Sequence, residues 1–493
     1  MVTMNRVSGA AAKMPEGERR DLAVRALAGS ESITALADEH GVSRNFVYEQ
    51  STRASTALAG VFSTAANDDE KVLFECAVTP RRLEQMILAL VLVGRASQRG
   101  VMEFLRDVMG WSISIGGVHD LLKAAAVRAR VINESVDLSG VRVGLHDEIF
   151  QGNRPVLAGV DAASTYCYLL AEEAHRDGDT WAVHLLDAKL RGLNPDFTIA
   201  DQGQGARIGQ LVAWGETPCH GDVFHIQHQF EGVANTLARV AQGSTTRCQK
   251  LQVRLDKGAT PDSVRREELE VALRADARMQ ALARDVRTLC NWLGRDVLAL
   301  AGPALATRQE LFDFVVAEMR RRESEDAPWI RPMRVALENQ RDALLAFARV
   351  LDDKLSAIAQ TQDVDEGLVR QVCLLERKPR TSAAYWQGWN RVRSLLTDKF
   401  HLVFDGVTRA MASTPRCSSL VENFNSRLRT YFTLRRHLGD SYLSLLQFFL
   451  NHRRFMRSRV GRQDHSPREL MTGQAHPHWF TLLGLGEPAP LRG

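Results

Sequence analysis

The sequence predicts an α/β protein: a core built on a mixed five-stranded sheet, interrupted by a large all-α insertion and preceded by an all-α helix-turn-helix region. Three observations lead to this prediction. Short runs of alternating apolar and polar residues lie between positions 141 and 226, as in strands with one buried face. From Gln229 to Met411 the apolar residues recur at helical spacing. Residues Ile33 to Ser51 have the spacing of two short helices joined by a turn.

Length and composition indicate a folded, multi-domain chain. Its 493 residues exceed the roughly 100–200 residues of a typical domain, and a hydrophobic content of 45% suffices for a sizeable core. The seven cysteines are scattered and form no CxxC pair, which argues against a disulfide framework and a Cys-rich zinc site. No signal-peptide pattern is found, and the longest apolar run, Met86 to Val93, is too short for a bilayer. We therefore expect a cytoplasmic protein with no membrane partner.

The charge distribution is more informative than the total charge. A formal net charge of +4 is only mildly basic, and many metabolic enzymes share it. Between Thr430 and Arg462, however, basic residues are frequent and Asp440 is the only acid. We expect a basic helical end that could follow a phosphate backbone. The alternative is a solvated helix face without a ligand.

The N-terminal region is predicted to be helical. Arg19 to Ala28 forms one helix, and Ile33 to Ser51 follows helix-turn-helix spacing, with a small residue, Ala37, where two helices cross. Gly41 takes the turn and Ser43 caps the second helix. A plain helical hairpin is the alternative. The residues that would point outward from a recognition helix are Arg44, Asn45 and Tyr48.

A second helical region follows. Ala54 to Asp69 is small and polar and is expected to be a linker, and Leu83 to Val93 is an apolar helix. Ser97 to Val108 and Ser114 to Arg130 are helices on either side of a turn at Gly110. They form either a second helix-turn-helix or a purely structural helical subdomain.

The strand pattern starts at Val141. The expected order is three antiparallel strands, helix, strand, helix, strand, with a hairpin turn at Gly152-Asn153. The strands are Val143 to Ile149, Val156 to Val160, Tyr166 to Ala171, Phe197 to Ala200 and Asp222 to Ile226, and the helices are Asp179 to Leu190 and Ala206 to Trp214.

Strand signals then disappear. The helical block includes Ser263 to Leu293, Arg308 to Arg322 and Arg331 to Thr361, and helices resume at Val421 to Tyr431 and Tyr442 to Phe455. The resulting domain prediction is an N-terminal helix-turn-helix domain at 1–60, a helical region at 61–138, the first part of the core at 139–228, an insertion at 229–411, the second part of the core with a basic helix at 412–470, and a tail at 471–493.

Three carboxylates are candidates for metal chemistry. Asp147 lies in the first strand, and Asp201 ends the fourth strand before Gly203, which lets the chain turn. Glu422 lies near the start of a helix, on its polar face. Carboxylates that converge at one sheet edge could hold two divalent metal ions for phosphoryl transfer. Asp161, at the end of the second strand, is an alternative to Asp147 as the first acid.

At these positions the chain resembles the DDE transposases and integrases of insertion sequences and retroviruses. Gly144 to Glu148 with Val156 to Ser164 resembles their first hairpin, and Ile199 to Gly203 resembles the strand with the second Asp. Ser418 to Leu428 resembles their Glu helix, and Ser466 to Leu470 resembles a frequent tail pattern. The resemblance implies an RNase H-like core and places the first acid at Asp147, on the first strand.

The resemblance also implies a function. The chain would be a bacterial, nucleoid-associated DNA transposase that binds terminal inverted repeats, cleaves the element ends and joins them to target DNA, as a dimer or larger assembly. The catalytic and metal-binding triad would be Asp147, Asp201 and Glu422, with two Mg²⁺ or Mn²⁺ ions. Asp222 and His225 match an Asp/Cys-x-x-His pattern and would have an auxiliary role, which we favour over a zinc site. Phosphates would be held by Asn425, Arg427, Arg429, Arg435 and Arg436.

Two alternative functions remain. The chain could be a metal-dependent nuclease on the same fold, or a catalytically inactive DNA-binding regulator derived from a transposase. The helical insertion would contact transposon-end DNA or the partner subunit. Its tryptophans are expected in the core, although one could stack on a flipped base. They are Trp292, Trp329, Trp386 and Trp389.

Overall fold

The computed structural model describes residues 11, 14–62, 76–201, 203–258, 263–433, 439–458 and 461–489. The chain divides into two compact units, Met1–Val78 and Thr79–Gly493. Each unit has its own apolar core, and the two are described separately below. In the described residues, no helix is long and apolar enough to cross a membrane.

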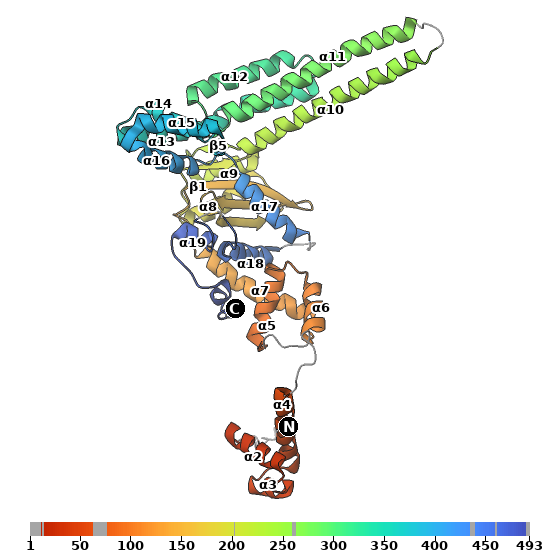
Figure 1. Ribbon diagram of the computed structural model, residues 1–493, viewed down its shortest axis with the longest axis vertical. Coiled ribbons are helices and arrows are strands. Elements are labelled where there is room, and N and C mark those ends of the chain that lie inside the picture. The colour runs from red at the N-terminus through yellow and green to blue at the C-terminus, as the bar shows by residue number, and fades with distance from the viewer. Residues whose placement is uncertain are drawn as a thin grey trace. The chain divides into compact units, whose positions relative to one another are not determined.

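The first unit contains three described helices that enclose a small core (Figure 1). They are α2 (Glu16–Ala28), α3 (Ile33–Glu39) and α4 (Arg44–Phe62). The turn between α3 and α4 uses Gly41 at a φ of 61°, a conformation that favours glycine. The hydroxyl of Ser43 then accepts the backbone N–H of Phe46 at 3.2 Å and caps α4. The predicted turn and cap are confirmed.

One boundary in this unit was predicted wrongly. Helix α4 continues to Phe62, so the first part of the expected linker at Ala54 to Asp69 is helical. Small residues such as alanine were taken as linker composition, but alanine has the highest helix propensity. The remainder of that stretch, residues 63–69, lies outside the described residues.

The second unit begins with helices α5 (Pro80–Leu92), α6 (Gln98–Met109) and α7 (Ile115–Glu134). Each starts where the hydroxyl of a threonine or serine accepts a backbone N–H of the first turn: Thr79, Ser97 and Ser114 respectively. Gly110, with a φ of 61°, ends α6. These helices agree with the prediction, and their buried faces join the core beneath the sheet.

The sheet has five strands in the order β3-β2-β1-β4-β5. Strands β1 (Val143–Gln151), β2 (Arg154–Asp161) and β3 (Cys167–Glu172) pair antiparallel. Strands β4 (Phe197–Ala200) and β5 (Cys219–Gly221) run parallel to β1. The predicted mixed five-stranded sheet is therefore present.

The last strand was placed too late in the sequence. Strand β5 ends at Gly221, and the expected strand from Asp222 to Ile226 is the start of helix α10 (Val223–Asp256). The carboxylate of Asp222 accepts the backbone N–H of Phe224 at 2.9 Å and caps this helix. Buried Val223, Ile226 and Phe230 follow helical spacing, which a five-residue window did not reveal.

Helices cover both faces of the sheet. Helices α8 (Gly178–Leu190) and α9 (Gln204–Trp214) pack on one face through buried Trp181, Leu185 and Trp214. The other face carries Leu145, Ile149 and Ile199 and packs against α17 (Ser419–Phe432) and α18 (Gly439–His452). We call this second face the α17 face of the sheet.

The segment between β5 and α17 is helical, as predicted. Helices α10 and α11 (Ser263–Trp292) lie side by side as a long antiparallel pair (Figure 1). A π-helical turn (Leu293–Val297) then leads into the remaining helices. They are α12 (Leu305–Arg322), α13 (Ala327–Gln362), α14 (Glu366–Leu375), α15 (Ala383–Leu396), a 3-10 turn (Thr397–Lys399) and α16 (Phe400–Ala412).

The expected basic helix near the C-terminus is instead an apolar one. Helix α18 is buried along most of its length, including Leu445, Phe448 and Phe449. The arginines from Arg453 onward follow its end. The prediction was wrong because the basic residues were counted over the whole stretch, which contains an apolar helix followed by a separate basic segment. Short helices α19 (Pro467–Thr472) and α20 (Trp479–Leu482) follow.

Candidate active site at the carboxyl ends of the parallel strands

Strand register brings three aspartates together. His146 of β1 pairs with Ala200 of β4, and Ala200 pairs with Gly221 of β5. The next residues along these parallel strands are Asp147, Asp201 and Asp222, which are therefore neighbours at the same edge. Side chains alternate between sheet faces. By this alternation, all three aspartates lie on the same face of the sheet as Leu145 and Ile199, which is the α17 face.

Helix α17 brings Glu422 to the same place. Its apolar residues Val421, Phe424 and Leu428 pack on the α17 face of the sheet. One turn after Glu422, the amide N–H of Asn425 donates to Oδ2 of Asp147 at 2.7 Å. The charge of Glu422 acts on Asp147, as do the charges of Asp201 and Asp222. The structure thus gathers the three predicted acids and adds Asp222.

The clustering of acids has a clear electrostatic effect. The pKa of Asp147 is raised from its usual 3.8 to about 7. Burial is the largest cause, and the negative charges of Glu422, Asp201 and Asp222 add to it. The backbone N–H of Glu148 opposes the shift by donating to Oδ1 at 2.8 Å. Negative charge on Asp147 is therefore unfavourable unless a cation is present.

The ligand atoms of these residues are of the type that binds divalent cations, but their side chains are not positioned around a common point. Carboxylate oxygens are the ligands that Mg²⁺ and Mn²⁺ prefer, and Oδ1 of Asn425 is buried without a hydrogen-bond partner among the described residues. Over that same part of the chain, no three His, Cys, Asp or Glu side chains are grouped closely enough to hold a metal ion. Oδ1 of Asp201 instead accepts the backbone N–H of Gly203 at 2.8 Å. Ion binding would therefore require side-chain rotations.

Asp222 connects the two separated parts of the core. Its buried carboxylate caps α10 and also accepts the backbone N–H of Ser418 at 3.2 Å and the Ser418 hydroxyl. Ser418 is the N-cap residue of α17, but its side chain makes no cap hydrogen bond to its own helix. Asp222 therefore fixes where the Glu422 helix begins. His225, its predicted auxiliary partner, is partly exposed and accepts the amide N–H of Gln229 at 2.8 Å.

Asp161 lies away from this cluster. It pairs with Gly144 and so belongs to the opposite sheet face from Asp147. Its carboxylate accepts the backbone N–H of Ser164 at 2.7 Å and also the Ser164 hydroxyl. Burial raises its pKa, and these bonds and Arg462 oppose the rise. These contacts are those of a turn-forming residue, so geometry favours Asp147 as the first acid.

A buried polar network holds β1 in place behind Asp147. The amide N–H of Gln210 donates to Nδ1 of His146, whose Nε2–H donates to the Tyr168 hydroxyl at 2.7 Å. Gln210 Oε1 accepts the hydroxyl of Thr198 from β4 at 2.8 Å. Burial lowers the pKa of His146 to about 3, which keeps the ring neutral. The network fixes β1 and β4 relative to each other, and with them Asp147 and Asp201.

Two further polar residues near the acids were not assigned to the acid cluster from the sequence. Asn425 was expected to contact DNA, but it is 1% exposed and bonds to Asp147, which corrects that expectation. Its spacing of three residues from Glu422 was the available signal. Glu148 accepts Nη1–H of Arg176 at 2.8 Å and Nε1–H of Trp181 at 3.1 Å. Because side chains alternate along β1, Glu148 lies on the opposite face of the sheet from Asp147.

The other predicted DNA-binding residues occupy different parts of the chain. In the first unit, Arg44, Asn45 and Tyr48 are exposed on α4, and Tyr48 is 57% exposed. In the second unit, Arg429 is exposed on α17, and Arg427 is partly buried. Arg435 and Arg436 lie outside the described residues.

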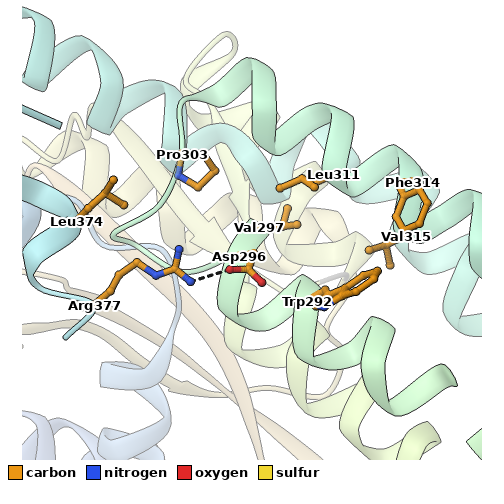
Figure 2. Close-up of a pocket in the computed structure, with 9 residues that line it drawn as sticks. All are labelled: Trp292, Asp296, Val297, Pro303, Leu311, Phe314, Val315, Leu374 and Arg377. Carbon is orange, nitrogen blue, oxygen red and sulfur yellow. Dashed lines mark hydrogen bonds and ion pairs between the residues drawn. The ribbon is translucent and has the colours of Figure 1, made fainter. Parts of the chain in front are cut away.

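The helical insertion contains an apolar pocket of about 600 Å³ (Figure 2). Trp292 and Phe314 lie at one end, and Arg377 forms an ion pair with Asp296 at 2.7 Å at the other. We expected the insertion tryptophans in the core. Trp292, Trp329 and Trp386 are instead 45%, 46% and 51% exposed, whereas Trp389 is partly buried against one of the apolar cores of the insertion. The pocket contains none of the predicted site residues.

No protein-family model and no curated protein matches the chain.

Proposed function

We propose that this chain is a DNA transposase of the DDE type with an RNase H-like core. One arrangement carries the proposal: Asp147 and Asp201 are neighbours on adjacent parallel strands, and the helix with Glu422 is joined to Asp147 through Asn425. Carboxylates from three separate elements at one sheet edge suit two-metal phosphoryl transfer. The mixed five-stranded sheet supports the proposed core type.

Each residue has a defined task in this proposal. Asp147, Asp201 and Glu422 would hold two Mg²⁺ or Mn²⁺ ions. When bound, the ions lower the pKa of the attacking water or 3′-hydroxyl and stabilise the leaving oxygen. Asn425 orients the Asp147 carboxylate through its amide N–H. Asp222 holds the start of α17 and so acts as a positioning residue.

The protonation of Asp147 links activity to pH. With a pKa of about 7, this carboxyl is partly protonated at neutral pH, and cation binding requires the ionised form. Cation affinity should therefore rise as the pH increases through 7. The DNA partners would be the element's terminal inverted repeats and the target, and joining two ends requires a dimer or larger assembly.

The test is cleavage and strand transfer on duplex DNA. The wild-type chain should nick element-end DNA with Mg²⁺ or Mn²⁺ and should join a pre-cut 3′ end to target DNA. Asp201→Asn and Glu422→Gln should each reduce both reactions by at least about 10³-fold, because removal of a ligand to the ions removes much of the electrostatic stabilisation of the transition state. DNA affinity should be unchanged, because the proposed DNA contacts remain.

Two outcomes would replace the proposal. Cutting without joining would identify a metal-dependent nuclease. DNA binding without cleavage under any divalent ion would identify a regulator that has lost catalysis. Full activity in Asp201→Asn would refute the site assignment itself.

A further inference from the structure

A second cavity lies on the other side of helix α17. It has a volume of about 280 Å³ and is formed by the α5–α6 turn, α17 and the segment that follows α18. Arg427 lies two residues after Asn425, which is about 200° around the helix axis. The acids and this cavity therefore lie on different sides of the same helix. Five arginines line the cavity, and none of the lining residues is acidic: Arg95, Arg427, Arg453, Arg454 and Arg457.

Most of this positive charge is not balanced. Arg454 is paired with Glu469 at 2.8 Å. The guanidinium groups of three others lie over aromatic rings: Arg95 over Tyr431 at 5.3 Å, Arg427 over Phe424 at 5.6 Å and Arg453 over Phe449 at 5.7 Å. Aromatic faces hold the guanidinium planes in position but leave most of their N–H donors available. Within the described residues, these three arginines and Arg457 form no ion pair with an acid.

The guanidinium group of Arg427 is incompletely hydrogen-bonded in the described part of the chain. Its Nε is buried and has no hydrogen-bond partner among the described residues, and a buried donor without an acceptor is costly. Burial lowers the pKa of this arginine, and the charges of Arg453 and Arg462 lower it further. Mutual repulsion of guanidinium groups around a cavity is relieved when an anion binds between them.

We propose that this arginine cavity binds a phosphate group of a DNA backbone, away from the phosphate at which the acids act. The inference rests on the proposed function, because it takes DNA as the ligand. A phosphate offers several acceptor oxygens, which match the fixed donors of arginine. Glu422 and Arg427 are separated by about 7.5 Å along the helix axis. A phosphate held by Arg427 would therefore position DNA relative to the acid cluster.

The test uses DNA binding rather than catalysis. Arg95→Gln and Arg457→Gln are combined, because both side chains are exposed and their loss should not disturb folding. The matched control is Arg106→Gln with Arg380→Gln, two exposed arginines that are already paired with Asp107 and Glu376. Circular dichroism checks that both double variants are folded.

Binding to a duplex of about 30 base pairs is measured by fluorescence anisotropy at several salt concentrations. The cavity variant should bind about three- to tenfold more weakly, and the slope of log Kd against log salt should fall by about 1, as expected for one lost phosphate contact. The control variant should match the wild-type chain. A wild-type slope in the cavity variant would overturn the proposal.

A second measurement separates DNA phosphate from free phosphate. If inorganic phosphate raises the melting temperature of the wild-type chain but not of the cavity variant, while the DNA slope is unchanged, the cavity binds free phosphate and the DNA assignment is wrong. Binding does not depend on the acids. A chain that binds DNA through the cavity but never cuts it would therefore contradict the proposed function and leave this inference intact.

Discussion

Replacement of Asp147 by asparagine should stabilise the cation-free protein while abolishing catalysis. The substitution removes a charge that the fold disfavours, since the pKa of this carboxyl rises from 3.8 to about 7 through burial and neighbouring acids. The amide oxygen of Asp147→Asn can still accept the bond from Asn425. A stabilising change at this position would distinguish a destabilising cluster of acids from an ordinary structural aspartate.

The size of the effect follows from the pKa. Each unit corresponds to about 1.4 kcal/mol, so ionised Asp147 lowers the free energy of unfolding by up to about 4 kcal/mol. An amide has one oxygen, so one of the two hydrogen bonds is lost, at about 1 kcal/mol. The expected net gain is about 1–3 kcal/mol.

The gain should depend on pH with a definite sign. In the unfolded chain this carboxyl ionises near 3.8, whereas in the folded chain it ionises near 7. The wild-type protein therefore loses stability as the pH rises from about 4 to about 7, and the loss is complete above 7. The advantage of Asp147→Asn should be largest at about pH 8 and should shrink toward about pH 4.

Urea unfolding of both proteins at a series of pH values measures this difference. On the proposed function, Mg²⁺ would bind the folded state only and should stabilise the wild-type chain, which would reduce the advantage of Asp147→Asn. A variant that is no more stable at about pH 8, or a gap that does not narrow with falling pH, would refute the electrostatic reasoning. A variant that still cleaves DNA would refute the site.

Three further predictions test other parts of the structure. Ser418→Ala should lower the free energy of unfolding by about 1–3 kcal/mol, because it leaves a buried carboxylate without its hydroxyl donor. Ser419→Ala, at an exposed site, should have little effect. Equal changes in urea titrations would contradict the structural role of the hydrogen bond between Ser418 and Asp222. Gly209→Ala should destabilise the protein by about 1–3 kcal/mol, since a Cβ there would lie 2.5 Å from a tryptophan Cβ. The control Gly232→Ala, whose Cβ would have no atom within 4 Å, should be neutral or stabilising. Calorimetry that finds no difference between the two variants would rule out the close packing of α8 on α9. Arg44→Ala should weaken DNA binding about tenfold without a change in melting temperature; unchanged anisotropy titrations would remove α4 from the DNA-binding surface.

The fold was largely predictable because its signals are local. Alternation located β1 and β2, short strand-like runs located β3 and β4, and capping serines and Gly110 located the helices near them. The failures occurred where a short window cannot distinguish two patterns. Asp222 to Ile226 resembles a short strand, but these residues cap and begin helix α10, and the basic stretch after Thr430 contains a buried apolar helix.

The positions of the three acids in the fold were predictable, but the contacts that hold them there were not. Asp147 and Asp201 occupy recognisable strand positions, and Glu422 lies on a helix with a polar face. The bond between Asn425 and Asp147 and the tie between Asp222 and Ser418 depend on how distant segments meet. No local pattern encodes such contacts, because they are set by the three-dimensional packing of α17 on the sheet.

The bond between Asn425 and Asp147 joins residues that are 278 positions apart. A ribosome needs roughly 15–55 s to synthesise that length at about 5–20 residues per second. During this interval the strand with Asp147 has already emerged, while the helix that covers its apolar face does not yet exist. A truncated product would carry two acids without the third, so on the proposed function an incomplete polypeptide could not break the chromosome that encodes it. On the proposed function, the long insertion therefore delays assembly of the acid cluster until most of the chain has been made.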